Sequence, residues 1–86
     1  MAKYSIVIKK SAAKELAKIP RHDLRRILSK IQDLFTTPRP PGAQKFAHFE
    51  LYRIRQGNYR IVYTINNTTI EIHIIKIGHR RDIYNF

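Results

Sequence analysis

A change of hydrophobic period near the middle of the chain is the feature that most restricts its fold. From residue 24 to residue 35, apolar residues recur at three- and four-residue spacing, as on one side of an amphipathic helix: Leu24, Ile27, Leu28, Ile31, Leu34 and Phe35. The segment 36–42 contains three prolines and a glycine, so it cannot continue that helix. Beyond it, apolar and polar residues alternate, which indicates strands. The pattern therefore predicts a helical part and a sheet part joined by a connector.

The other elements follow from the same two periods. Alternation over 4–9 predicts a first strand, and Ser11 is placed to cap a short helix over 12–19 that ends at Pro20. After the connector, we expect strands at 51–55, 59–65 and 69–77, with turns at Gly57-Asn58 and Asn66-Asn67. The last strand is apolar at nearly every position near its end, which is typical of a central strand.

These elements predict an α+β fold with the order β-α-α-β-β-β. We expect an antiparallel-rich four-stranded sheet, with the first strand beside the last and a two-helix hairpin packed on one face. The 86 residues are sufficient for a single domain, 1–86. There is no cysteine, and no apolar run is long enough to span a bilayer or to form a signal peptide, so we expect a cytoplasmic protein without disulfides.

The charge of the chain indicates its class of partner. Lysine and arginine number 17 against six acidic residues, giving a net charge of +11. Such an excess is self-repulsive in a small fold unless a polyanion neutralises it, and nucleic acid is the first candidate. An anionic membrane surface and an acidic protein are the alternatives. The histidines and carboxylates show no metal-ligand spacing, and no phosphate loop or dinucleotide fingerprint is present, so we expect neither metal nor cofactor.

Late in the chain, arginines gather where phosphate could bind. If Tyr52 and Ile54 point toward the helices, the side chains that alternate with them point away, and the same holds in the next strand. This places three guanidinium groups on one open face and adds a basic tail just beyond the last strand: Arg53, Arg55, Arg60, then His79, Arg80, Arg81 and Tyr84. Each arginine alone could be an ordinary solvated residue, but forked guanidinium donors together match phosphodiester geometry.

Three segments carry a resemblance to a known family: Leu51-Tyr52-Arg53-Ile54-Arg55, Asn58-Tyr59-Arg60-Ile61-Val62-Tyr63 and Ile77-Gly78-His79-Arg80-Arg81-Asp82-Ile83-Tyr84. In this order and spacing they resemble the RelE branch of the RelE/ParE toxin superfamily. The resemblance implies a RelE-like toxin of a type II toxin–antitoxin system. It further implies an RNA-binding mRNA interferase, a metal-independent endoribonuclease that cuts messenger RNA in the ribosomal A site and so inhibits translation. A cognate antitoxin would neutralise it, and the complex would bind operator DNA through the antitoxin.

The resemblance also implies roles for single residues. Arg53 and Arg55 fall where RelE proteins place two basic residues, and Arg60 matches a phosphate-binding arginine. Arg80 matches an arginine implicated in charge stabilisation and leaving-group protonation, and Tyr84 matches a tyrosine that stacks on or orients the messenger. Arg81 would add an RNA contact.

The general base is where the chain departs from the family. Some relatives carry lysines at the positions of Arg53 and Arg55, and a guanidinium, with a pKa above about 12, does not give up its proton at neutral pH. His79 and Tyr84 are the residues we expect to exchange protons in this part of the chain. A ParE-like inhibitor of DNA gyrase and a non-catalytic RNA-binding module remain the alternative functions.

Overall fold

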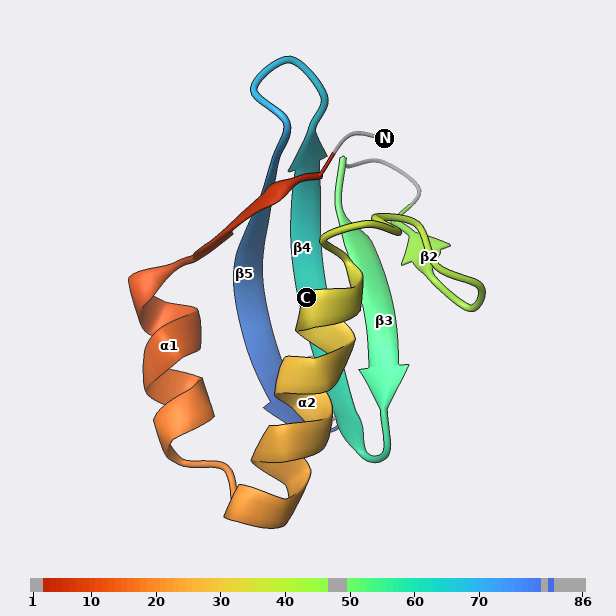
Figure 1. Cartoon of the computed structure of the whole chain (residues 1–86). Coiled ribbons are helices and arrows are strands. Elements are labelled where there is room, and N and C mark those ends of the chain that lie inside the picture. The colour runs from red at the N-terminus through yellow and green to blue at the C-terminus, as the bar shows by residue number, and fades with distance from the viewer. Residues whose placement is uncertain (1–2, 47–49, 80, 82–86) are drawn as a thin grey trace.

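The computed structural model describes residues 3–46, 50–79 and 81, which form two helices and five strands. In chain order these are β1 (Ser5–Ile8), α1 (Lys10–Ala17), α2 (Arg21–Asp33), β2 (Gln44–Lys45), β3 (Tyr52–Gln56), β4 (Tyr59–Asn66) and β5 (Glu71–His79) (Figure 1). The α+β class and the element order predicted from the sequence are confirmed. No helix in the described part of the chain is long and apolar enough to cross a membrane.

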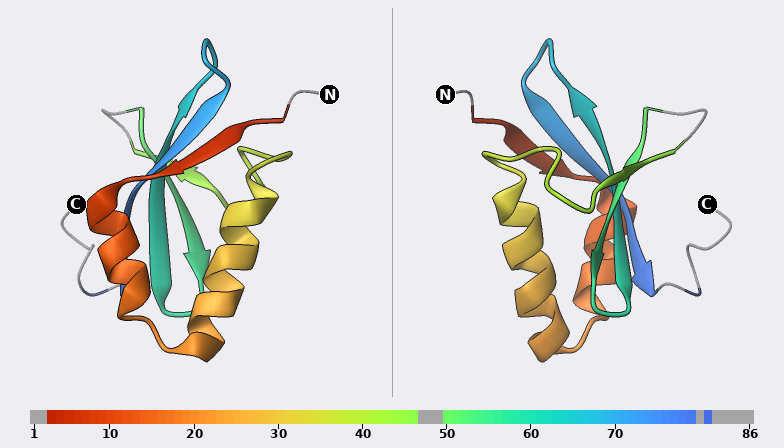
Figure 2. Two further views of the ribbon diagram at one scale, coloured as in Figure 1. Left: turned by 60° about the vertical axis from the view of Figure 1, so that its left-hand side comes forward. Right: turned by 90° about the vertical axis from the view of Figure 1, so that its right-hand side faces the viewer.

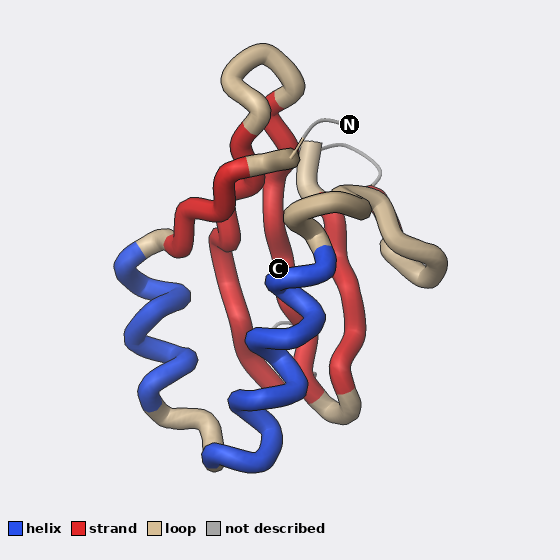
Figure 3. The backbone as a smooth tube through the Cα atoms, viewed as in Figure 1, coloured by secondary structure: helices blue, strands red, loops and turns tan. Residues whose placement is uncertain are grey.

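The strands form one mixed sheet with both helices on the same face. Its order is β1-β5-β4-β3-β2, with β1 parallel to β5 and the other neighbours antiparallel. Helix α1 packs against β5 and α2 against β3, and the two helices run in opposite directions (Figure 2). Figure 3 shows both helices in front of the sheet, and no helix of the described residues covers the opposite face. The predicted pairing of the first strand with the last is therefore confirmed.

The core lies between the helices and the sheet. Helix α2 contributes Ile27, Ile31 and Leu34, and the central strands contribute residues such as Ile61 and Tyr63, all nearly or completely inaccessible to solvent. Because these positions follow a period near 3.6 in the helix and 2 in β4, each element presents one apolar side to the same interior. The strand residues that alternate with these core residues therefore lie on the opposite face of the sheet.

The predicted strand number was one too few. Residues Gln44 and Lys45 pair antiparallel with Arg53 and Tyr52, so β2 is a short fifth strand at the sheet edge. A two-residue strand directly after a proline-rich connector is too short to show a period, and only the pairing with β3 defines it.

The start of the first helix also differs from the prediction. Lys9, and not Ser11, is the N-cap residue, and no side chain caps the helix there. The Lys9 amide donates a hydrogen bond of 2.9 Å to the Ile74 carbonyl, which keeps the chain extended beside β5 until the helix begins at Lys10. A tertiary contact therefore set this boundary in place of a local cap.

A bulge changes the alternation within β5. Tyr63 is paired with Ile74 and Val62 with Lys76, so Ile75 is the extra residue. As a result, Ile74 and Ile77 both belong to the core although they are three positions apart. Lys76, which pairs with Val62, lies on the face away from the helices.

Candidate nucleic-acid interface

The sheet register brings three arginines to the face opposite the helices. Arg55 and Arg60 are directly paired across β3 and β4, and Arg53 is paired with Val62 one row away. Their neighbours in sequence, including Tyr52, Ile54 and Ile61, are buried in the core on the other side. The alternation of the two strands thus places Arg53, Arg55 and Arg60 together, as their sequence pattern predicts.

A hollow of about 300 Å³ lies where these arginines meet the edge of the sheet. Its lining combines the three guanidinium-bearing residues with side chains from α2 and the connector: Lys30, Asp33, Pro40, Pro41, Gly42, Gln44, Arg53, Ile54, Arg55 and Arg60. Among the described residues, β2 pairs with β3 at Arg53 and Tyr52 and no strand pairs with the outer edge of β3 beyond Arg53; that edge borders the hollow. Four cations and one carboxylate therefore surround a single concave site.

The arginines are held to different degrees. Arg53 is half-buried; its Nη2 donates a hydrogen bond to Gln44 Oε1 across the β2–β3 pair, and its guanidinium lies 5.8 Å from the centre of the Phe46 ring. Arg60 is half-buried, and its Nη1 donates to the Tyr59 carbonyl at 3.4 Å. Arg55 is exposed, and its side chain makes no hydrogen bond or ion pair within the described part of the chain. Arg53 is thus pre-positioned by contacts of its own, whereas Arg55 can reach outward to a ligand.

The connector that walls the hollow is fixed to the sheet by two stacked tyrosines. Tyr63 donates a 2.8 Å hydrogen bond from its hydroxyl to the Pro38 carbonyl, and its ring stacks on Tyr52 with 5.7 Å between centroids. Arg39 Nε donates to the Tyr52 hydroxyl at 3.1 Å, and this bond raises the pKa of Arg39. Burial raises the pKa of Tyr63 to about 12, so its phenol remains a hydrogen-bond donor at neutral pH.

The basic tail is described only in part. The register pairs His79 with Tyr59, and the two rings meet edge to face at 5.9 Å, so His79 lies on the side of the sheet opposite Arg60. Its Nδ1 accepts a hydrogen bond from the backbone N–H of Arg81 at 3.3 Å, and in the neutral ring this places the proton on Nε2. The Arg81 side chain is exposed. Arg80 and Tyr84 lie outside the described residues.

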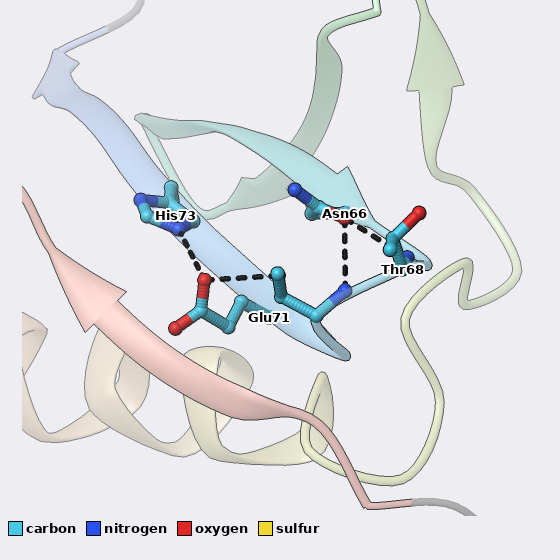
Figure 4. Close-up of polar contacts among 5 residues, drawn as sticks. Asn66, Thr68, Glu71 and His73 are labelled. Atoms are coloured by element: carbon cyan, nitrogen blue, oxygen red, sulfur yellow. Dashed lines mark hydrogen bonds and ion pairs between the residues drawn. The ribbon is translucent and has the colours of Figure 1, made fainter.

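At the other end of the sheet, the β4–β5 turn carries a separate polar cluster (Figure 4). Glu71 Oε1 accepts hydrogen bonds from Thr69 Oγ1 at 2.9 Å and from His73 Nε2 at 3.2 Å, and His73, followed by Thr69, lowers the pKa of Glu71. Asn66 Oδ1 accepts from the backbone amides of Thr68 and Thr69. These bonds close the turn on itself, which is a structural role.

Sequence reasoning missed four residues near the arginines. Lys30 and Asp33 line the hollow from α2, Gln44 comes from the unrecognised β2, and Lys76 shares the row of Arg53 and Val62. The sequence does indicate that Lys30 and Asp33 lie on the same side of a helix, because they are three residues apart. For Lys76, the bulge in β5 breaks the two-residue alternation that would have indicated its face.

Comparisons with known proteins agree with this architecture. A family model described as the ParE toxin of the type II toxin–antitoxin system parDE matches residues 6–84. The archaeal RelE–RelB complex from Pyrococcus horikoshii contains a similar chain: 30% sequence identity, a TM-score of 0.78, and coverage of 93% of this chain and 97% of that one. The RelB–RelE antitoxin–toxin complex from Methanococcus jannaschii contains a chain with 28% sequence identity and a TM-score of 0.75, and the match covers 93% of this chain and 96% of that one.

The RelBE2 toxin–antitoxin complex from Mycobacterium tuberculosis has a TM-score of 0.81 at 22% identity, covering 91% of this chain and 99% of that one, and so supports the fold alone. No curated protein sequence matches the chain significantly. Since the family model covers nearly the whole chain and the archaeal RelE is 30% identical over most of both chains, the protein belongs to the ParE toxin family of type II toxin–antitoxin systems, within the RelE/ParE superfamily.

Proposed function

We propose that this toxin is a metal-independent endoribonuclease that cleaves messenger RNA in the ribosomal A site. The observation that carries the proposal is the convergence of Arg53, Arg55 and Arg60 on one face and around one hollow. Planar guanidinium groups bind phosphate oxygens through paired donors. A group of them therefore suits a phosphodiester as its ligand better than it suits an apolar protein surface.

In the proposed reaction, the 2′-hydroxyl of the RNA attacks the adjacent phosphorus. The new P–O2′ bond forms, the P–O5′ bond breaks, and the products are a 2′,3′-cyclic phosphate and a 5′-hydroxyl. The 2′-hydroxyl must lose a proton and the 5′-oxygen must gain one, while negative charge accumulates on the phosphorane oxygens. Arg60, half-buried and held near the strand backbone, stabilises that charge, with Arg80 as its partner from the tail.

The other predicted residues divide into binding and proton transfer. Arg53, Arg55 and Arg81 hold the RNA backbone, and Tyr84 stacks on or orients the messenger. His79 is proposed for proton transfer. The His79 ring lies on the side of the sheet opposite Arg60, so the RNA would have to pass around the end of β5 to reach it. The Arg81 amide occupies its Nδ1, so the neutral ring presents an N–H at Nε2 that can donate to the leaving oxygen there. A base for the 2′-hydroxyl is then to be sought in Tyr84 or in the ribosome.

The proposed protein partner is a cognate antitoxin. The toxins of the archaeal complexes that this chain resembles are bound to RelB antitoxins. A net charge of +11 favours an acidic antitoxin segment that folds on binding. We further propose that the antitoxin carries the complex to operator DNA and that the toxin acts in the cytoplasm, where ribosomes translate.

Primer extension on a message translated in a reconstituted extract tests the nuclease function. Arg60→Ala should reduce the cleavage rate roughly 10²–10³-fold, because one preorganised donor to the developing charge is lost. Arg25→Ala is the matched control, since it removes the same charge from an exposed position on α2 outside the hollow. Undiminished cutting by Arg60→Ala, or an equal loss in the control, would show that the face does not act as proposed.

Inhibition of DNA gyrase is the second candidate, because the matching family model is that of a ParE toxin. A supercoiling assay with purified gyrase separates the two. Inhibition of supercoiling with intact messenger RNA would establish the ParE-like function. Salt-sensitive RNA binding with neither activity would instead indicate a non-catalytic RNA-binding module.

A further inference from the structure

The hollow draws on both layers of the fold, and its helical side has no part in the function proposed above. Lys30 and Asp33 lie one turn apart on α2 and line the hollow opposite Arg53, Arg55 and Arg60. Helix α2 packs on the core side of the sheet, whereas the arginines lie on the other side. The two sets meet around the edge of β3, where no strand pairs beyond Arg53 in the described part of the chain.

The charged groups from α2 are available to a ligand. Neither the Lys30 ammonium nor the Asp33 carboxylate makes a hydrogen bond or an ion pair with another residue in the described ranges. Beyond the helix, the Asp33 backbone carbonyl accepts a 3.0 Å hydrogen bond from the Thr37 amide. Its carboxylate is therefore an unused acceptor within a lining that otherwise carries positive charge.

The size and the walls of the hollow suit one nucleotide. Its volume of about 300 Å³ is at the lower end of small-molecule sites. The rings of Pro40 and Pro41 supply apolar surface for a flat base. The cations supply donors for its phosphates.

We propose that this hollow is a subsite for a single guanine nucleotide of the bound RNA, with Lys30 on a phosphate and Asp33 on the base. This inference rests on the proposed function in taking RNA as the ligand, and it assigns a base preference to one end of the site. The strand of RNA would bend around the edge of β3 and place one base between that edge and α2.

The preference follows from the chemistry of a carboxylate, which only accepts hydrogen bonds. Guanine presents two adjacent N–H donors on its Watson–Crick edge, at N1 and N2, which can pair with both oxygens. Adenine and cytosine each offer one amino group beside a ring nitrogen that is itself an acceptor and repels the carboxylate. Uracil offers one N–H between two carbonyls. A matched bidentate pair discriminates between bases by about 10- to 100-fold.

The experiment measures binding of the full chain to fluorescent seven-nucleotide single-stranded RNAs away from the ribosome. One oligomer is all adenine and the other carries guanine at its centre. The wild-type chain should bind the guanine oligomer about 10-fold more tightly or better. In Asp33→Asn the guanine preference should disappear, leaving the two affinities within about 2-fold or in favour of adenine, because the amide offers one acceptor and one donor and matches adenine instead. Asp23→Asn, on the same helix but outside the hollow, should leave the preference unchanged.

Lysine variants test the phosphate contact in the same assay. Lys30→Gln should weaken binding to both oligomers equally and reduce the slope of log K against log salt by about 0.7, the value for one phosphate contact on a single strand. Lys14→Gln removes the same charge from an exposed site on α1 and should change the slope less.

The subsite is refuted if the wild-type chain binds both oligomers alike, or if Asp33→Asn keeps the guanine preference. Those results leave the nuclease proposal intact as long as Arg60→Ala still lowers cleavage on the ribosome. Failure of the wild-type chain to bind either RNA, together with absence of cleavage, would overturn both proposals.

Discussion

Tyr63 fixes the connector to the sheet, and replacing it by phenylalanine tests whether this single bond stabilises the wall of the hollow. The ring is wholly buried and stacked on Tyr52, and its hydroxyl donates to the Pro38 carbonyl at 2.8 Å. Tyr63→Phe keeps the ring and its packing, so it creates no large cavity. The change removes one hydrogen bond and leaves the Pro38 carbonyl without its donor.

The magnitude follows from the burial of this bond. A hydrogen bond lost from a part-buried site, with one partner left unsatisfied, costs about 1–2 kcal/mol of unfolding free energy. For a domain of this length, that loss lowers Tm by roughly 4–16 °C. The connector should loosen at the same time, and with it the segment 40–42 that lines the hollow.

The pH dependence provides a second signature of the same hydroxyl. Burial raises the pKa of Tyr63 to about 12, whereas an unfolded tyrosine ionises near pH 10. The folded pKa is the higher one, so the wild type has the full contribution of this group below pH 10 and loses it as pH rises toward 12. Phenylalanine has no such proton, and the stability difference between the two proteins should therefore narrow over that window.

Urea denaturation followed by circular dichroism, at pH 7 and at steps from about pH 8.5 to 11.5, measures both effects across the window in which the hydroxyl ionises. Tyr59→Phe is the control, because Tyr59 is half-buried and its hydroxyl has no hydrogen-bond partner among the residues that the structure describes. It should change the midpoint by much less. The reasoning is wrong if Tyr63→Phe unfolds at the wild-type midpoint at pH 7, or if the difference between the two proteins stays constant up to the highest pH.

Two further predictions concern the turns. Gly57 has a φ of 60°, and a methyl group added at its Cα would meet nothing within 4 Å. Gly57→Ala should therefore destabilise the protein through the backbone alone, by about 1–2 kcal/mol of unfolding free energy. Thermal unfolding measures this loss, and an unchanged Tm would contradict it. His73→Ala should raise the pKa of Glu71 toward its ordinary value, because the hydrogen bond from His73 is the largest cause of its lowering. In the wild type, the folded-state pKa of Glu71 is depressed, so this interaction stabilises the fold above the ordinary glutamate pKa and is lost as pH falls. Carboxyl NMR titration of both proteins measures the shift, and equal titration curves would show that the bond is not formed in solution.

Elements with their own local periodicity were predictable from the sequence, whereas features defined by distant residues were not. Helix α2 and strands β3 and β4 were predicted because each repeats its own period over several residues, and the shared face of Arg53, Arg55 and Arg60 follows from that period. Strand β2 and the start of α1 could not be predicted, since both are defined by hydrogen bonds to residues far along the chain. The bulge at Ile75 is likewise defined only by the pairing of β5 with β4.

By itself, the sequence determined which side chains alternate, where the helices must stop, and that a large positive charge surrounds a small core. Tertiary structure alone decided that Lys30 and Asp33 meet the arginines of the sheet, because these residues lie on separate elements that converge on one hollow, whose connector wall is hydrogen-bonded to the sheet through Tyr63 and the Pro38 carbonyl. Periodicity is a property of neighbouring residues. A hollow forms between elements, and its composition depends on how those elements pack.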